Sequence, residues 1–241
     1  MKPDPQYAGE GAGSDVASLW MTDKPVAEVS GLWKKLAAVY PQTGLWPLVL
    51  EPLAADNQDR PWTNGELVPG DVSAVDGVDP AEVLSTGWEQ LVSLAGGDPA
   101  LKPFGTKFAG LAGAEQRCVG DIGEVVQQID GPFRLGLVAV RRPADALTRI
   151  GWLGPANYEQ DIATYSAVLR SWEDRFGAYV VDIGFDTLTI AAERPPERGS
   201  DRNLLAAEMT ALDPDLVLQG VDSVGALAPQ AGSTTWKFWW D

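Results

Sequence analysis

Two aspartates, Asp182 and Asp186, lie where the sequence pattern could support chemistry. They belong to the stretch AYVVDIGFDTLTIAAE, whose alternating apolar residues predict a β-hairpin with Asp186 at its turn. Two neighbouring carboxylates can share a proton in acid–base catalysis or coordinate Mg²⁺. Aspartate is also a common turn residue, so the hairpin alone would explain the pair.

A second group of charges lies in the sequence SWEDR, near the end of a predicted helix. Glu173 and Asp174 stand there beside Arg170 and Arg175. Acidic residues are unfavourable at a helix C-terminus, which carries partial negative charge. The group is therefore either a solvated helix face or a surface that recognises a lysine or arginine of a partner.

The third candidate region is the aromatic segment TTWKFWWD at the end of the chain. In a β-strand, Trp236, Phe238 and Trp240 would share one face, and burying three large rings would fix this strand at the closing edge of the sheet. The other face would carry polar and aromatic groups suited to binding, because tryptophan favours sites where an apolar ring meets water. The candidate binding residues in this segment are Trp239, Lys237 and Asp241.

The residues that are missing exclude much of enzymology. The 241 residues contain no histidine, so Ser-His-Asp and Cys-His machinery and histidine-bound metals are absent. The single Cys118 cannot form an internal disulfide, and we expect an unreactive, half-buried thiol. The glycine-rich stretches match neither a phosphate-binding loop nor a dinucleotide fingerprint. We find no cofactor motif or metal-ligand set, and catalysis would rest on carboxylates, lysine, arginine, tyrosine or a hard metal ion.

Composition indicates an acidic globular protein. The net charge of −16 repels phosphate backbones and anionic lipids, so nucleic-acid and membrane binding are not expected, whereas a basic protein partner is favoured. The chain has no apolar run of membrane-spanning length, and its first residues lack the pattern of a secretory signal. These features together predict a cytoplasmic protein.

Amphipathic helices and short apolar strands alternate irregularly along the chain. Helices are expected after Asp23 up to Pro41, from Asp79 to Gly96, after Arg142 up to Gly151, from Asn157 to Gly177 with Gln160 completing the cap, at 204–212 and at 223–230. Strands are expected at 43–52, 134–140, 178–193 as a hairpin, and 234–240. Pro47 lacks an N–H donor, which places its strand at a sheet edge or turns its backbone outward. The expected core residues are Trp33, Trp88, Trp172, Phe176, Val181 and Ile183.

This order of elements favours an α+β fold with a mixed or antiparallel sheet packed against amphipathic helices and closed by the C-terminal strand. Residues 1–18 are expected to form a flexible arm, residues 19–120 an N-terminal α+β subregion and residues 121–241 a C-terminal domain. Residues 99–120 are either a linker between the two halves or a loop over the core.

Several phrases in the second half resemble the bacterial family catalogued as domain of unknown function 4253. They are RLGLVAVRRPADAL, IGWLGPANY, VLRSWEDRFGAYVVDIGFDTLTI and WKFWWD. TGLWPLVL and RPWTNGE also resemble the region that precedes this domain in actinobacterial members. The resemblance implies an intracellular bacterial protein of α+β type, and it implies no reaction and no catalytic residues.

Two functions remain open on these grounds. The first is a non-catalytic, acidic protein-interaction module, for example one that neutralises a basic toxin or effector, because opposite charge steers association. The second is a carboxylate-dependent hydrolase acting on a sugar or phosphoester, with tryptophan stacking on the substrate.

Overall fold

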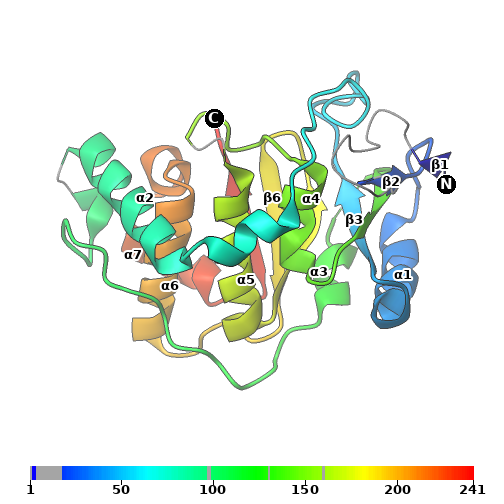
Figure 1. Ribbon diagram of the computed structural model, residues 1–241. Helices are drawn as coiled ribbons and strands as arrows, with labels where there is room; N and C mark the ends of the chain where they lie inside the picture. Colours follow the sequence, from blue (N-terminus) through cyan, green and yellow to red (C-terminus); the bar gives the residue numbers. More distant parts are fainter. Residues whose placement is uncertain (1, 4–17, 97–98, 130, 159–160) are drawn as a thin grey trace.

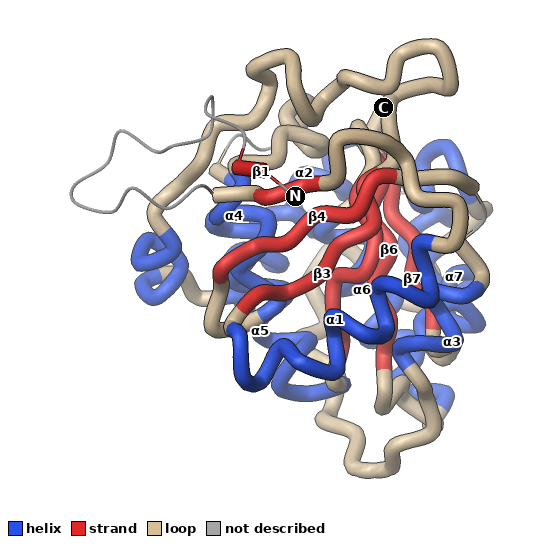
Figure 2. The backbone as a smooth tube through the Cα atoms, turned by 90° about the vertical axis from the view of Figure 1, so that its right-hand side faces the viewer, coloured by secondary structure: helices blue, strands red, loops and turns tan. Residues whose placement is uncertain are grey.

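The computed structural model describes residues 2–3, 18–96, 99–129, 131–158 and 161–241, and the strands in these ranges form one mixed sheet. The strand order is β1-β2-β4-β3-β5-β6-β7, and only the β3–β5 pair is parallel. The strands are β1 (Lys2–Pro3), β2 (Trp20–Met21), β3 (Leu45–Leu50), β4 (Arg134–Ala139), β5 (Ala178–Ile183), β6 (Thr187–Ala192) and β7 (Thr235–Trp239). The predicted α+β class is confirmed, and β7 closes the sheet beside β6. Figure 2 shows the strands side by side, from β1 and β2 through β4 and β3 to β6 and β7.

Helices pack against the sheet and also lie to its sides. They are α1 (Val29–Thr43), η2 (Val72–Gly77), α2 (Pro80–Ala95), η3 (Pro99–Leu101), α3 (Ile122–Gln127), η4 (Pro143–Asp145), α4 (Ala146–Ile150), α5 (Ile162–Phe176), α6 (Gly199–Leu212), η5 (Leu216–Gly220) and α7 (Val224–Ala231). In Figure 1, α4 and α5 lie in front of the strands, α2, α6 and α7 are grouped on the left, and α1 lies on the right beside β3. None of the helices within the described ranges combines the length and apolar character needed to cross a bilayer.

The aromatic face of β7 forms the centre of the core. Trp236, Phe238 and Trp240 are all at most 2% exposed. The Trp172 ring on α5 stacks on Phe238 at 5.6 Å and meets Trp236 edge-on at 5.7 Å. Truncating such a ring typically costs about 3–5 kcal/mol. The six predicted core residues are likewise buried, each at most 2% exposed, which confirms that prediction.

The strand that contains Pro47 lies inside the sheet, so an edge position was the wrong alternative. β3 pairs with β4 along its length, whereas its ladder with β5 covers only Val49 and Leu50. Where β3 and β5 diverge, two backbone carbonyls that the ladder leaves unpaired accept hydrogen bonds from tryptophan side chains. Trp33 Nε1 donates to Pro47 O at 2.9 Å, and Trp46 Nε1 donates to Val180 O at 2.7 Å. In a strand the N–H and C=O of one residue point to the same side. Proline at this position therefore removes no ladder hydrogen bond.

Two predicted helix starts differ from the structure. The long helix α5 begins four residues later than expected, because Asp161 rather than Asn157 is the N-cap and its carboxylate accepts the N–H of Ala163 at 3.0 Å. Gln160, the expected partner in that cap, lies outside the described residues. Helix α1 begins at Val29 rather than after Asp23, and it continues through Pro41 to the left-handed Gly44. By contrast, α2 has the predicted Asp79 cap and ends at Gly96 as expected.

A fully buried carboxylate ties the loop after η3 to the helices. Glu208 on α6 has no exposed surface, and Arg175 donates to its two oxygens at 2.9 and 2.5 Å. Trp172 Nε1 and the backbone N–H of Ala112 complete its hydrogen bonds at 2.8 and 2.7 Å. The segment around Ala112 therefore lies on the core as a loop. Most of the expected N-terminal arm falls outside the described residues, apart from Lys2, Pro3 and Ser18.

Candidate functional site

The strand register brings two predicted site residues into one row. Asp182 on β5 is paired with Thr189 on β6, and Thr189 is paired with Lys237 on β7, so the three side chains share one face of the sheet. This is the face opposite to the buried aromatic rings of β7. On the same face, the neighbouring row contains Thr187 paired with Trp239.

Asp182 is the most unusual residue of this face. It is 3% exposed, and its Oδ2 accepts a hydrogen bond from Thr189 Oγ1 at 3.2 Å. Its Oδ1 is buried and has no hydrogen-bond partner within the described part of the chain. Burial, and then the charge of Glu51, raise the pKa of Asp182 well above its ordinary value. A carboxyl group in this environment favours its protonated form.

Glu51 supplies a second carboxylate from the N-terminal half of the chain. It follows β3 directly, and its N–H donates to Ile183 O at 2.9 Å, which places it beside the end of β5. Its carbonyl accepts Trp62 Nε1 at 2.7 Å, so the backbone is held from both sides. Burial raises the pKa of Glu51, while the charge of Lys237 lowers it. The sheet thus creates a carboxylate pair that interacts with one lysine.

The exposed end of this face belongs to β7. Lys237 is exposed and Trp239 is half-buried. Gln230 Nε2 on α7 donates to Lys237 O at 2.8 Å and holds the strand in place. Gly184 leaves space between the rows, since a Cβ there would collide with the Thr187 hydroxyl. We call the set Glu51, Asp182, Thr187, Thr189, Lys237 and Trp239 the carboxylate face.

Two aspartates after α6 fix β7 and the residues that follow it. Asp213 is fully buried and accepts the N–H groups of Trp239 at 3.0 Å and Asp215 at 3.1 Å. Asp215 accepts the Asp241 N–H at 3.0 Å and the Tyr158 hydroxyl at 2.7 Å. Burial raises the pKa of Asp213 to about 8, although the Trp239 N–H lowers it. These bonds hold the backbone of Trp239 and Asp241 in addition to the ladder between β6 and β7.

The remaining predicted site residues do not join the carboxylate face. Glu173 accepts hydrogen bonds from Arg142 Nε and the Ala144 N–H, both at 3.1 Å, and Asp174 accepts Arg142 Nη2 at 2.6 Å. Burial raises the pKa of Glu173. Both carboxylates of SWEDR are therefore bonded within the molecule. Asp186 lies in the hairpin turn, where its carbonyl accepts the Trp240 N–H at 3.0 Å.

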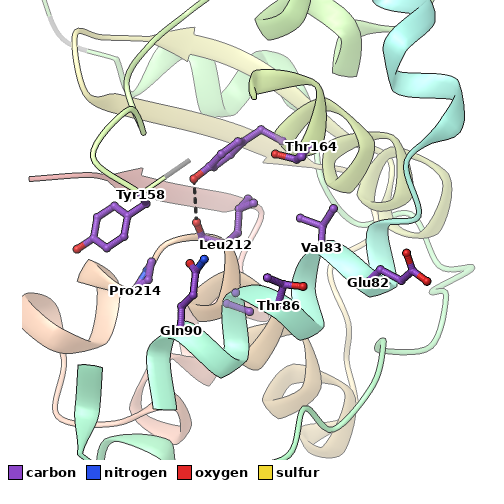
Figure 3. Close-up of a pocket in the computed structure, with 11 residues that line it drawn as sticks. Glu82, Val83, Thr86, Gln90, Tyr158, Thr164, Leu212 and Pro214 are labelled. Carbon is purple, nitrogen blue, oxygen red and sulfur yellow. Dashed lines mark hydrogen bonds between the residues drawn. The ribbon is translucent and has the colours of Figure 1, made fainter. Parts of the chain in front are cut away.

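A separate hollow of about 250 Å³ lies between α2, α5 and α6. Figure 3 shows Thr86 and Gln90 of α2 across from Tyr158 and Leu212. Its walls are mainly apolar, and Tyr158 at its edge is already bonded to Asp215. The hollow contains none of the predicted site residues.

Neither Cys118 nor a cluster of possible metal ligands adds a second candidate site within the described residues. Cys118 is exposed, which corrects the expectation of a half-buried thiol, because the loop around it lies on the surface. Within the described ranges there is no group of three or more His, Cys, Asp or Glu side chains that could hold a metal ion.

One family model matches the second half of the chain. The model of a domain of unknown function, DUF4253, matches residues 134–241, and this confirms the resemblance noted in the second half of the sequence. No curated protein and no solved structure matches the chain. The matched region contains every residue of the carboxylate face except Glu51.

Sequence reasoning found half of this face. Asp182, Lys237 and Trp239 were predicted as candidates, but the electrostatic interaction of Asp182 and Lys237 with Glu51 was not. The only local signal for Glu51 is its position directly after the apolar run LWPLVL. The parallel pairing of β3 with β5 joins the two halves of the chain, and it brings Glu51 close to Asp182.

Proposed function

We propose that the protein is a carboxylate-dependent hydrolase that acts on a neutral, sugar-like substrate at the carboxylate face. The observation that carries this proposal is the buried Oδ1 of Asp182, which has no hydrogen-bond partner among the described residues. An unbonded buried polar atom reduces stability, and strongly perturbed carboxyl groups concentrate at functional sites.

The two carboxyl groups have different roles in this proposal. Asp182, the more buried group, is protonated and gives its proton to the leaving-group oxygen while the C–O bond breaks. Glu51 is closer to solvent, and the charge of Lys237 opposes the increase in its pKa that burial causes. In this proposal Glu51 is the ionised partner and accepts a proton from the attacking water. The oxygen of that water forms the new bond to carbon, and the proton taken by Glu51 returns through solvent to Asp182.

The surroundings favour a sugar over a phosphoester. The ionised Glu51, in a protein of net charge −16, repels a phosphate group. Trp239 is half-buried and provides a ring on which a sugar could stack, and the Thr187 hydroxyl lies beside it in the same row. Asp182 is at the buried end of the face and Lys237 at the exposed end, so the substrate would enter past Lys237 and Trp239.

The test is hydrolysis of a panel of nitrophenyl glycosides between pH 4 and 8. Wild type is expected to release nitrophenol, and Asp182→Asn and Glu51→Gln should each lose about 100-fold or more, as is usual when a general acid or base is removed. Asp222→Asn and Glu89→Gln change exposed acids elsewhere and serve as matched controls. Absence of turnover by wild type on the whole panel, or full activity of Asp182→Asn, would refute the proposal.

The acidic interaction module is the second candidate, and its supporting observation is the distribution of charge. The net charge is −16, and several arginines are bonded to acids within the chain, which leaves a surplus of acidic groups. Eight of the ten tryptophans are buried, however, so little aromatic surface is available for a partner. This function predicts a stoichiometric basic partner whose affinity falls with rising salt and does not change in Asp182→Asn. Salt-independent affinity would count against it.

A further inference from the structure

A hollow of about 550 Å³ next to the end of β4 collects arginines in an otherwise acidic protein. It lies between η2, the residues after β4, α4 and α5. Its charged lining comprises Arg141, Arg142, Arg149, Arg170, Asp71, Asp76 and Asp145. The carboxylate face contributes no residue to it.

Two of these arginines are structural. Arg142 donates to Glu173, to Asp174 and to the carbonyl of Arg170, the last at 2.9 Å. Arg170 donates to the buried Asp145 at 2.5 Å and to Asp76 at 2.6 Å. Their charges are therefore neutralised by neighbouring acids, and their role is to hold η2, η4 and α5 together.

The other two arginines are available for a ligand. No hydrogen bond or ion pair of the Arg141 or Arg149 side chain occurs within the ranges that the structure describes. Their backbones are nevertheless well fixed: the Tyr40 hydroxyl donates to Arg141 O at 2.8 Å, and Arg149 lies in the last turn of the largely buried α4. Arg149 also acts on Asp71, whose pKa is lowered mainly by hydrogen bonds from Ser73 and, to a smaller extent, by Arg149.

We infer that this hollow binds the oxyanion group of a small ligand, a phosphate or a carboxylate, through Arg141 and Arg149. A guanidinium presents paired N–H donors that match two oxygens of either group. The acidic surface does not prevent this, because at about 0.1 M salt exposed charges are screened beyond about 10 Å. The hollow is lined by four arginines and three aspartates, so its lining carries one more positive than negative charge.

The test uses isothermal titration calorimetry with inorganic pyrophosphate and, separately, citrate, in about 50 mM NaCl. At least one anion should bind, and Arg141→Ala and Arg149→Ala should each weaken binding 10-fold or more. Binding of pyrophosphate alone identifies the ligand group as phosphate, and binding of citrate alone identifies it as carboxylate. Because neither arginine is part of an ion pair, both variants should unfold at the wild-type temperature.

Arg198→Ala is the matched control, since Arg198 is exposed and does not line the hollow. It should bind the anion like wild type, and so should Asp182→Asn, which keeps this result separate from the proposed hydrolase. The inference is overturned if neither anion binds, or if Arg198→Ala weakens binding as much as the other two substitutions.

Discussion

Two buried carboxyl groups, those of Glu208 and Asp182, differ in how completely their oxygens are hydrogen-bonded. Glu208 receives hydrogen bonds from a guanidinium, an indole and a backbone N–H, and both of its oxygens are bonded. Asp182 receives one hydroxyl, and its second oxygen has no partner in the described part of the chain. Burial of the two residues is almost equal, at 0% and 3% exposed.

The difference separates a structural acid from a candidate functional one. A buried charge whose hydrogen bonds are all made holds its neighbours in one arrangement, and removing it leaves the partner charge buried alone. A buried acid with an unbonded oxygen lowers the stability of the fold. Selection for stability alone would not keep Asp182, whereas it would keep Glu208. Four substitutions of charged residues test this comparison.

The largest effect is expected for Glu208→Ala. It leaves Arg175, whose side chain is only 14% exposed, without its carboxylate and removes the acceptor for Trp172 and Ala112, so the free energy of unfolding should fall by about 3–5 kcal/mol. Urea unfolding followed by tryptophan fluorescence measures this. Glu89→Ala on the exposed side of α2 should change stability by less than about 0.5 kcal/mol. A similar small loss for Glu208→Ala would remove the contrast with Asp182.

Asp213→Asn should have the next largest effect. One acceptor oxygen becomes a donor that faces a backbone N–H, with an expected loss of about 1–3 kcal/mol. Because the pKa of Asp213 is raised to about 8, the folded chain binds this proton more tightly than the unfolded chain. Its contribution to stability is complete at low pH and is lost as the pH rises through about 8. The fall in wild-type stability between pH 5 and 9 should therefore be smaller in Asp213→Asn; an equal fall would contradict this assignment.

Asp182→Asn should change stability by less than about 1 kcal/mol at pH 5, because an amide resembles the protonated acid. The raised pKa of Asp182 means that its contribution is also lost with rising pH, so the variant should be more stable than wild type at pH 9. Thermal unfolding at the two pH values checks the crossing. A large loss at both pH values would make Asp182 a structural residue like Glu208.

The smallest effect is expected for an exposed ion pair. Arg117 and Glu197 are 2.8 Å apart, with side chains 71% and 45% exposed. Arg117→Ala should cost at most about 1 kcal/mol, since solvent and salt screen such pairs. Urea unfolding at low and high salt measures it. A loss approaching that of Glu208→Ala would show that burial does not set the order of these effects.

The fold was more predictable than the site, for a physical reason. Local sequence patterns were sufficient to predict features that depend on neighbours in sequence. These are the aromatic face of β7, the hairpin from Ala178 to Ala192 and the Asp79 cap of α2. The start of α5 was wrong because Asp161 competes with Asn157 as a cap. The carboxylate pair depends on Glu51 meeting β5 across the sheet, and no local pattern encodes that contact.

The position of β3 between β4 and β5 has a consequence for the segment of this chain that matches the family model. The matched segment 134–241 contains β4 and β5 but not the strand that joins them. Expressed alone, it would expose the unpaired edges of two strands, and such edges recruit further chains into aggregates. The segment that the family model matches therefore lacks the strand that links its own strands in this sheet. Without residues 45–50, this segment would have to obtain its central strand from another part of the chain or from a second molecule.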